Sequence, residues 1–199
     1  MNNEEVVSIL KKGGIAVIPN DTIYGIICDA LNEKTIKKIY ELKNRDYSRP
    51  MLILVSDINM LKKCCKSINQ LEERLINEYL PGELTIILNK SSYIPSIVSN
   101  KDTVGIRIPN DENLIKIISG LGNPIVSTSA NISNKESITD ISMLEDEIKD
   151  NVDFIYDGGT INKKPSTIIK VENNKIVILR EGNLSSDIRK KIQRKYRHL

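Results

Sequence analysis

The segment Pro124-Ile125-Val126-Ser127-Thr128-Ser129-Ala130-Asn131 is the stretch around which this chain is organised. Its short apolar run precedes three hydroxyl residues and an amide, which indicates a buried strand leading into a loop. In an open α/β sheet, ligands bind outside the carboxyl ends of strands. Hydroxyls and amides at such an end can hold a carboxylate, a phosphate or an amino group. The same residues can also form a Ser/Thr turn that binds only its own backbone.

Strands and helices alternate along most of the chain, and a hairpin with Asn173-Asn174 in its turn follows them. We expect strands at 15–18, 24–27, 51–55, 84–88, 103–109, 124–126, 154–156, 166–171 and 175–179. We expect helices at 4–12 (capped by Asn3), 33–42, 57–64, 67–79, around Leu114–Leu121, at 140–149 (capped by Asp140) and from 185 onward. This order predicts one α/β domain over residues 1–199 with a mixed sheet.

Composition limits the classes of protein that fit. The 199 residues are 40% hydrophobic and 28% charged, as in a soluble globular domain, and the net charge of +3 permits but does not require contact with nucleic acid. Cys28, Cys64 and Cys65 lack metal-ligand spacing, which favours a reducing, cytoplasmic compartment. We see no signal-peptide pattern and no apolar run of transmembrane length. Because His198 is the only histidine, a histidine-dependent triad or metal site is not expected.

Several cations occupy positions that invite two interpretations. Lys43, Arg45 and Arg49 lie in one loop, which is either solvated or a clamp for phosphates, without a Walker or Gly-rich pattern. Arg107 lies within an apolar strand and either points to solvent or binds a carboxylate. Arg180 ends the last hairpin strand, where a surface pair with Glu181 is the simple alternative.

In order and spacing, these features resemble the YrdC-like threonylcarbamoyl-AMP synthases, in the short single-domain bacterial form. The matching blocks are Gly13–Gly25, Lys43–Arg45, Pro81–Thr85, Val104–Pro109, Ser127–Asn131, Asp157–Gly159, Ser166–Ile168 and Leu179–Gly182. They lie within residues 13–182, before a basic helix at 185–199. The resemblance implies an open, twisted mixed sheet with flanking helices around a basic cavity.

The resemblance also implies the reaction. L-threonine, bicarbonate and ATP give threonylcarbamoyl-AMP and diphosphate, catalysed by a nucleotidyltransferase. A partner transferase complex then uses this product to make N6-threonylcarbamoyladenosine in tRNAs that read ANN codons. Magnesium is expected to arrive with ATP, and neither a prosthetic group nor a protein-bound metal nor a membrane is expected.

The resemblance assigns roles to particular residues. L-threonine would be held by Thr22, Arg107, Ser127 and Ser166. ATP would be held by Lys43, Arg45, Arg49, Thr103, Ser129, Asn131, Ser137 and Arg180, with Lys43 and Arg45 also acting in catalysis. The chain departs from the family at Asn20, where many relatives have Thr, and at Leu54, where some have His.

Two other interpretations remain open at this stage. A non-catalytic RNA-binding module could use the basic concave face and the basic tail Arg189–Arg197, which can contact tRNA. Against it, stacking aromatics are scarce, since Trp is absent and Phe154 is the only Phe. A related carbamoyl-adenylate enzyme, such as the YrdC-like part of hydrogenase maturation proteins, would require a much longer chain.

Overall fold

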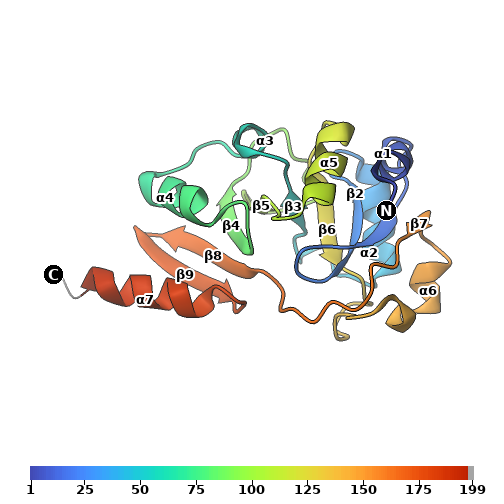
Figure 1. Ribbon diagram of the computed structural model, residues 1–199. Coiled ribbons are helices and arrows are strands. Elements are labelled where there is room, and N and C mark those ends of the chain that lie inside the picture. Colours follow the sequence, from blue (N-terminus) through green and yellow to red (C-terminus); the bar gives the residue numbers. More distant parts are fainter. Residues whose placement is uncertain (197–199) are drawn as a thin grey trace.

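The computed structural model describes residues 1–196, with side chains described through residue 192. Its strands form one mixed sheet in the order β7-β1-β2-β6-β3-β5-β4-β8-β9 (Figure 1). The strands are β1 (Ala16–Pro19), β2 (Tyr24–Asp29), β3 (Leu52–Leu54), β4 (Leu84–Asn89), β5 (Thr103–Arg107), β6 (Ile125–Ser129), β7 (Phe154–Ile155), β8 (Thr167–Glu172) and β9 (Lys175–Arg180). The pairs β1/β7, β3/β5 and β4/β8 are parallel and the other neighbours antiparallel, which confirms the predicted mixed sheet.

Helices lie on both faces of the sheet. They are α1 (Asn3–Lys11), α2 (Glu33–Leu42), α3 (Ile58–Cys64), α4 (Gln70–Tyr79), α5 (Glu112–Leu121), α6 (Asp146–Lys149) and α7 (Ser185–Tyr196), with a 3₁₀ turn η1 (Ile141–Met143). Helices α1 and α5 pack side by side and bury a cluster that includes Ile18, Ile27 and Ile125 (Figure 1). Helices α2, α3 and α4 contribute to a second, larger cluster that includes Val17, Ile26 and Ile53. Because strand residues alternate between faces, the two clusters lie on opposite faces of the sheet.

Three local predictions need correction. Asn2, not Asn3, caps α1, because its side chain accepts from the amides of Glu4 and Glu5. The helix expected at 140–149 is split: Asp140 caps η1, Leu144 is extended, and α6 starts at Asp146. Strand β6 continues through Ser129, so Ser127 and Ser129 belong to the sheet and not to the following loop. Ser127 pairs with both Ile27 and Leu52, which holds this segment extended.

The Asn-Asn hairpin is confirmed. Asn173 and Asn174 both have left-handed φ angles, 49° and 58°, which a type I′ hairpin turn requires. Before this hairpin, residues 156–166 run from β7 to β8 without regular structure (Figure 1). The hydroxyl of Tyr24 fastens that segment: it accepts from the Gly158 amide (3.0 Å) and donates to the Gly159 carbonyl (2.7 Å).

No helix within residues 1–196 is both long and apolar enough to cross a membrane. The three cysteines are unpaired and buried.

Candidate functional site

A cavity of about 270 Å³ lies over one face of the sheet. Its floor follows the strand register: Leu54 pairs with Arg107, Ile86 with Ile106, and Ile168 with Arg180. Paired residues on neighbouring strands share a face, so the register places Leu54, Arg107, Thr85, Ile168 and Arg180 in one row. Ile125, which α1 and α5 bury, pairs with Leu54 and continues this row. The cavity therefore occupies the part of that face that α1 and α5 leave uncovered.

Most of the residues predicted from the sequence meet at this cavity. Those that line it are Thr22, Arg45, Arg49, Arg107, Ser127, Ser129, Ser137, Ser166 and Arg180. Ser127 and Ser129 face it together because positions two apart on a strand point to the same side. The expected location outside a strand end is wrong in detail, since these serines line the cavity from within β6.

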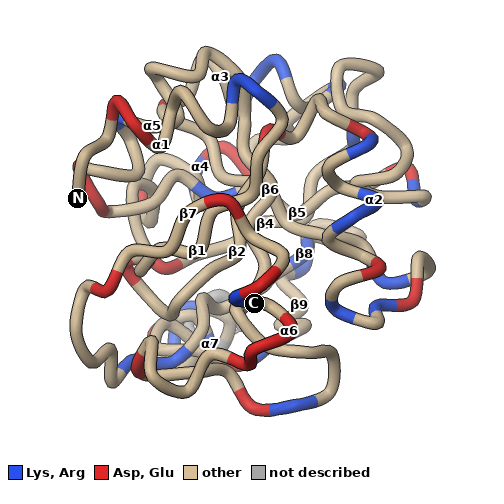
Figure 2. The backbone as a smooth tube through the Cα atoms, turned by 90° about the vertical axis from the view of Figure 1, so that its right-hand side faces the viewer, with Lys and Arg blue, Asp and Glu red and all other residues tan. Residues whose placement is uncertain are grey.

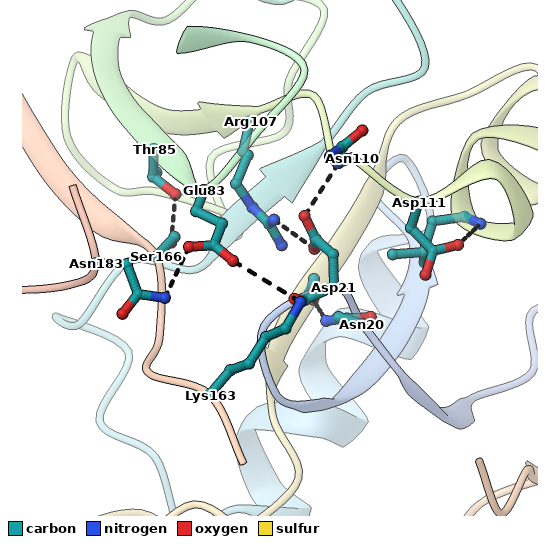
Figure 3. A network of polar contacts seen from close by, with 12 residues as sticks. Asn20, Asp21, Glu83, Thr85, Arg107, Asn110, Asp111, Lys163, Ser166 and Asn183 are labelled. Atoms are coloured by element: carbon teal, nitrogen blue, oxygen red, sulfur yellow. Dashed lines mark hydrogen bonds and ion pairs between the residues drawn. The ribbon is translucent and has the colours of Figure 1, made fainter. Parts of the chain in front are cut away.

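Arg107 makes a buried ion pair that sequence analysis missed. Its guanidinium donates to Asp21 Oδ1 at 2.5 Å, and both side chains are about 95% removed from solvent, at 5% and 6% exposure (Figure 3). The other oxygen of Asp21 accepts from the Asn110 amide at 3.0 Å. Arg107 is therefore a buried cation at the cavity, not a surface residue. Only one of its N–H groups is used by this pair, which leaves other donors for a ligand.

Arg180 is tied to Ser166 from the neighbouring strand. Its Nε donates to the Ser166 carbonyl (3.0 Å) and its second guanidinium nitrogen to Ser166 Oγ (2.9 Å). Ser166 Oγ also shares a hydrogen bond of 2.8 Å with Thr85, which lines the cavity as well (Figure 3). Burial, and next the charge of Arg107, lower the pKa of the Arg180 guanidinium. The two positive charges therefore disfavour each other across the cavity that both arginines line.

The side-chain amide of Asn20 contacts Ser127, and both residues line the cavity. Asn20 Nδ2 donates to Ser127 Oγ at 3.0 Å, so the hydroxyl hydrogen of Ser127 stays available. Asn20 Oδ1 is buried without a hydrogen-bond partner. Thr22, three residues before Gly25, is also buried and lines the cavity.

The basic loop closes the cavity on one edge. Arg45 donates to the carbonyls of Arg49 (3.0 Å) and Pro50 (2.8 Å), and Arg49 donates to Asn134 Oδ1 (2.9 Å). Arg45 is half-buried, whereas Arg49 is exposed. The loop therefore forms one edge of the cavity. The interpretation that leaves it entirely in solvent does not hold.

Lys43, Asn131 and Thr103 do not line the cavity, although the resemblance assigns them to ATP. Lys43 is 1% exposed, and its amine donates to the carbonyls of Ser129 (2.5 Å) and Asn131. The Asn131 side chain turns inward to the carbonyls of Ile132 and Lys135. Thr103 shares a face of β5 with Arg107 but lies at its other end, two residues before Gly105, which pairs with Leu52.

Asn20 and Thr85 line the cavity and Asp21 contacts Arg107, but sequence reasoning gave none of the three a role. Asp21 and Asn20 stand inside the block that carries the family resemblance, directly before Thr22, and Thr85 ends another block. Their position in these blocks was the available signal. Among the described residues, no group of three or more His, Cys, Asp or Glu side chains can hold a metal ion.

A family model described as telomere recombination, covering Sua5, YciO and YrdC, matches residues 8–182. The chain belongs to the Sua5/YciO/YrdC family. A putative threonylcarbamoyl-AMP synthase from Methanocaldococcus jannaschii is 45% identical over 190 residues, which cover 92% of this chain and 89% of that protein. The resemblance to YrdC-like threonylcarbamoyl-AMP synthases, which are nucleotidyltransferases, is thereby confirmed.

Two solved structures of this family share the fold. Pyrococcus abyssi Sua5 complexed with L-threonine superposes with a TM-score of 0.89 at 30% identity, over 96% of this chain and 58% of that one. Escherichia coli YciO gives a TM-score of 0.82 at 26% identity, over 92% of this chain and 91% of that one. This chain therefore spans little more than half of the Pyrococcus relative and nearly all of YciO.

Because the Arg107–Asp21 pair is buried, removing one partner is expected to lower the free energy of unfolding strongly. Asp21→Ala leaves the Arg107 charge buried and uncompensated, so we expect it to lower the free energy of unfolding by about 3–5 kcal/mol. Asp146→Ala is the control, because Asp146 pairs with Lys149 while remaining 91% exposed, and such pairs contribute about 0–1 kcal/mol. Urea unfolding at pH 7 measures both. Equal losses in the two variants would contradict a buried pair.

The burial of Lys43 predicts that the free energy of unfolding depends on pH. Burial, and next the charge of Arg45, lower its pKa to about 7; Arg49 acts in the same direction and Glu145 opposes. Between this pKa and the higher pKa of Lys43 in the unfolded chain, only the unfolded state binds the proton. The free energy of unfolding therefore rises with pH in this window, and this contribution is lost as pH falls through 7. The slope approaches about 1.4 kcal/mol per pH unit.

The measurement is urea unfolding of wild type and Lys43→Met at pH 6, 7.5 and 9. Other titrating groups are common to both proteins, so the difference between their unfolding free energies isolates Lys43. We expect that difference to shift in favour of wild type as pH rises. A difference that stays constant from pH 6 to 9 would show that Lys43 keeps its proton in the folded state.

Proposed function

We propose that this protein is an L-threonylcarbamoyladenylate synthase that converts L-threonine, bicarbonate and ATP to threonylcarbamoyl-AMP and diphosphate. The observation that carries the proposal is the charge of the cavity. Arg45, Arg49, Arg107 and Arg180 line it, and its described lining contains no Asp, Glu, Lys, His or Cys. Because the Asp21 carboxylate pairs with Arg107 and with none of the other three arginines, the cavity keeps a positive excess that suits several anionic reactants.

The threonine end of the proposed site is built around Arg107. Its free N–H groups would hold the carboxylate by charge-assisted hydrogen bonds. The hydroxyls of Thr22, Ser127 and Ser166 stand around the same space and would hold the amine and the threonine hydroxyl. The L-threonine complex of the Pyrococcus relative supports this part of the proposal.

The nucleotide end is the edge formed by the basic loop. Arg45, Arg49 and Arg180 would neutralise the phosphates, and Ser129 and Ser137 would donate to their oxygens. Magnesium, when bound, would neutralise part of the triphosphate charge. The described cavity lining offers it no carboxylate, so the nucleotide phosphates are its expected ligands.

The reaction then needs positioning more than acid–base chemistry. The threonine nitrogen forms a bond to the carbon of bicarbonate and water leaves, which gives a carbamate. A carbamate oxygen forms a bond to the α-phosphorus, and the bond from that phosphorus to the bridging oxygen breaks as diphosphate leaves. Arg45 and Arg180 would stabilise the charge that moves onto diphosphate. The two ends of the cavity hold the reacting groups in contact.

The product would pass to a tRNA-modifying transferase complex that makes N6-threonylcarbamoyladenosine in tRNAs reading ANN codons, in the cytoplasm. The alternative, a non-catalytic RNA-binding module, gains little support from the charge pattern. Figure 2 shows Lys and Arg segments interspersed with Asp and Glu segments along the backbone. The end of the basic tail, residues 197–199, lies outside the described residues.

The deciding experiment incubates purified protein with L-threonine, bicarbonate, ATP and magnesium. We expect mass spectrometry to detect threonylcarbamoyl-AMP, with diphosphate in equal amount, and no product when any one substrate is left out. L-Valine in place of L-threonine is the control for hydroxyl recognition. A protein that binds tRNA in a filter assay but forms no adenylate would replace our proposal with the RNA-binding alternative.

Arg107→Ala tests the threonine end directly. We expect threonine affinity to fall by about 1.5–3 kcal/mol, the value of charge-assisted hydrogen bonds, while ATP affinity changes little. Calorimetry with each ligand measures this split. The double variant Asp21→Asn/Arg107→Ala serves as control, because it removes the carboxylate charge that the single variant leaves buried. Unchanged threonine affinity in either folded variant would exclude Arg107 from the site.

A further inference from the structure

Lys43 is buried beside residues 127–131, the segment that carries Ser127 and Ser129. It reaches this segment from the end of α2. It follows the last residue of α2 and caps the carboxyl end of that helix. Its amine donates to the carbonyls of Ser129 (2.5 Å) and Asn131, on either side of Ala130. The side chain thus holds the two carbonyls at which β6 ends and the chain turns away.

The backbone of Lys43 makes a third connection to the same turn. Its carbonyl accepts from the Ser133 amide at 2.9 Å. Through its amine and its carbonyl, Lys43 therefore contacts residues at 129, 131 and 133. A single residue at the end of α2 fixes the path of the chain from β6 into the loop.

Groups at the edge of the cavity depend on that path. Ser129 lines the cavity at the start of the turn and Ser137 lines it further on. Between them, Asn134 adopts a left-handed φ of 71° and accepts from Arg49 at 2.9 Å. If the turn moved, Ser129, Ser137 and the Asn134–Arg49 contact would move with it.

We propose that Lys43 is a positioning residue, which holds the turn at 129–133 in place by binding its carbonyls and does not itself contact the nucleotide phosphates. The proposal rests on the proposed function only for the identity of the nucleotide.

Several observations support this role over a phosphate clamp. Lys43 is 1% exposed and is not among the residues that line the cavity. To reach a phosphate, its amine would have to leave the carbonyls of Ser129 and Asn131, and an unpaired buried carbonyl is unfavourable. The lowered pKa of Lys43, about 7, agrees with this role, because a neutral amine still donates to carbonyls but offers no charge to a phosphate.

The number of phosphates on the ligand shows which contacts each variant loses. Calorimetry with adenosine, AMP, ADP and ATP would compare wild type, Lys43→Met and Arg49→Met in the full chain. Lys90→Met is the control for losing a lysine–carbonyl bond, because Lys90 donates to the Ser99 carbonyl and does not line the cavity.

We expect Lys43→Met to weaken ATP more than adenosine, since the displaced turn carries Ser129, Ser137 and the Asn134 contact to Arg49. Arg49→Met should also weaken binding more as phosphates are added, reaching roughly ten-fold or more for ATP. Lys90→Met should bind like wild type. Unchanged ATP affinity in Lys43→Met would overturn the proposal.

Two further variants separate positioning from a direct phosphate contact, and they keep the test decisive if Lys43→Met is poorly folded. Lys43→Gln retains a neutral donor for the carbonyls, and Lys43→Arg retains the charge in a larger side chain. Recovery of nucleotide binding by Gln rather than Arg supports positioning, and recovery by Arg alone overturns it.

Hydrogen exchange separates failure of this proposal from failure of the proposed function. If wild type binds no adenine ligand, the nucleotide site is wrong, but the role of Lys43 in the turn is still measurable. We expect amides at 129–133 to exchange faster in Lys43→Met than in wild type or Lys90→Met. Unchanged exchange there would overturn the positioning role.

Discussion

Positive charge withdrawn from water is the constraint on which the centre of this protein depends. Lys43 and Arg107 are almost fully buried and Arg180 is half-buried, yet of these three only Arg107 is paired with a carboxylate, that of Asp21. A buried amine or guanidinium is stabilised by groups that accept from its N–H bonds, whether or not it carries its full charge. For Lys43 these groups are two backbone carbonyls, and for Arg180 the carbonyl and hydroxyl of Ser166. Each of these cations thereby joins segments that are far apart in the sequence.

These connections explain the position of the cavity. Arg107 links β5 to the turn before β2, and Arg180 links β9 to the start of β8. Lys163 adds a contact from the irregular segment 156–166 to the Asp21 carbonyl at 2.9 Å (Figure 3). Helices α1 and α5 cover the same face near β1, β2, β6 and Leu54 of β3. The remaining strands leave polar side chains on an uncovered face, and the loops around it close its edges.

Local sequence patterns predicted most of the strands and the hairpin, because alternation and turn residues act over short distances. The residues around the cavity were assigned by the family resemblance. What local patterns could not predict depends on distant partners. Asp21 and Arg107 are 86 positions apart, so nothing near either residue indicates their pairing. Ser127 and Ser129 were assigned to a loop because hydroxyls end apolar runs, but pairing with β2 on one side, and with β3 at Ser127, keeps them in the sheet. Lys43 looked like part of a basic loop because its burial is a property of the folded chain alone.

The structure shows what surrounds Asn20 and Leu54, the two positions at which the chain departs from the family pattern. Asn20 packs against Gly25, where an added Cβ would lie 2.5 Å from Asn20 Nδ2 and 3.2 Å from Ser127 Oγ, so an amide at position 20 requires glycine at position 25. The amide in turn donates to Ser127, which makes Asn20 part of the cavity wall and not a neutral replacement. Leu54 pairs with Arg107 on the neighbouring strand. It presents an apolar side chain at the position where the histidine of some relatives would offer a polar one. Because Leu54 brings no hydrogen bond, the hydroxyls of Thr22, Ser127 and Ser166 are the polar groups that line the cavity with Arg107 in the proposed threonine end. Relatives with the same sheet can therefore differ in what they bind, since these wall positions, and not the fold, decide which polar groups a ligand meets.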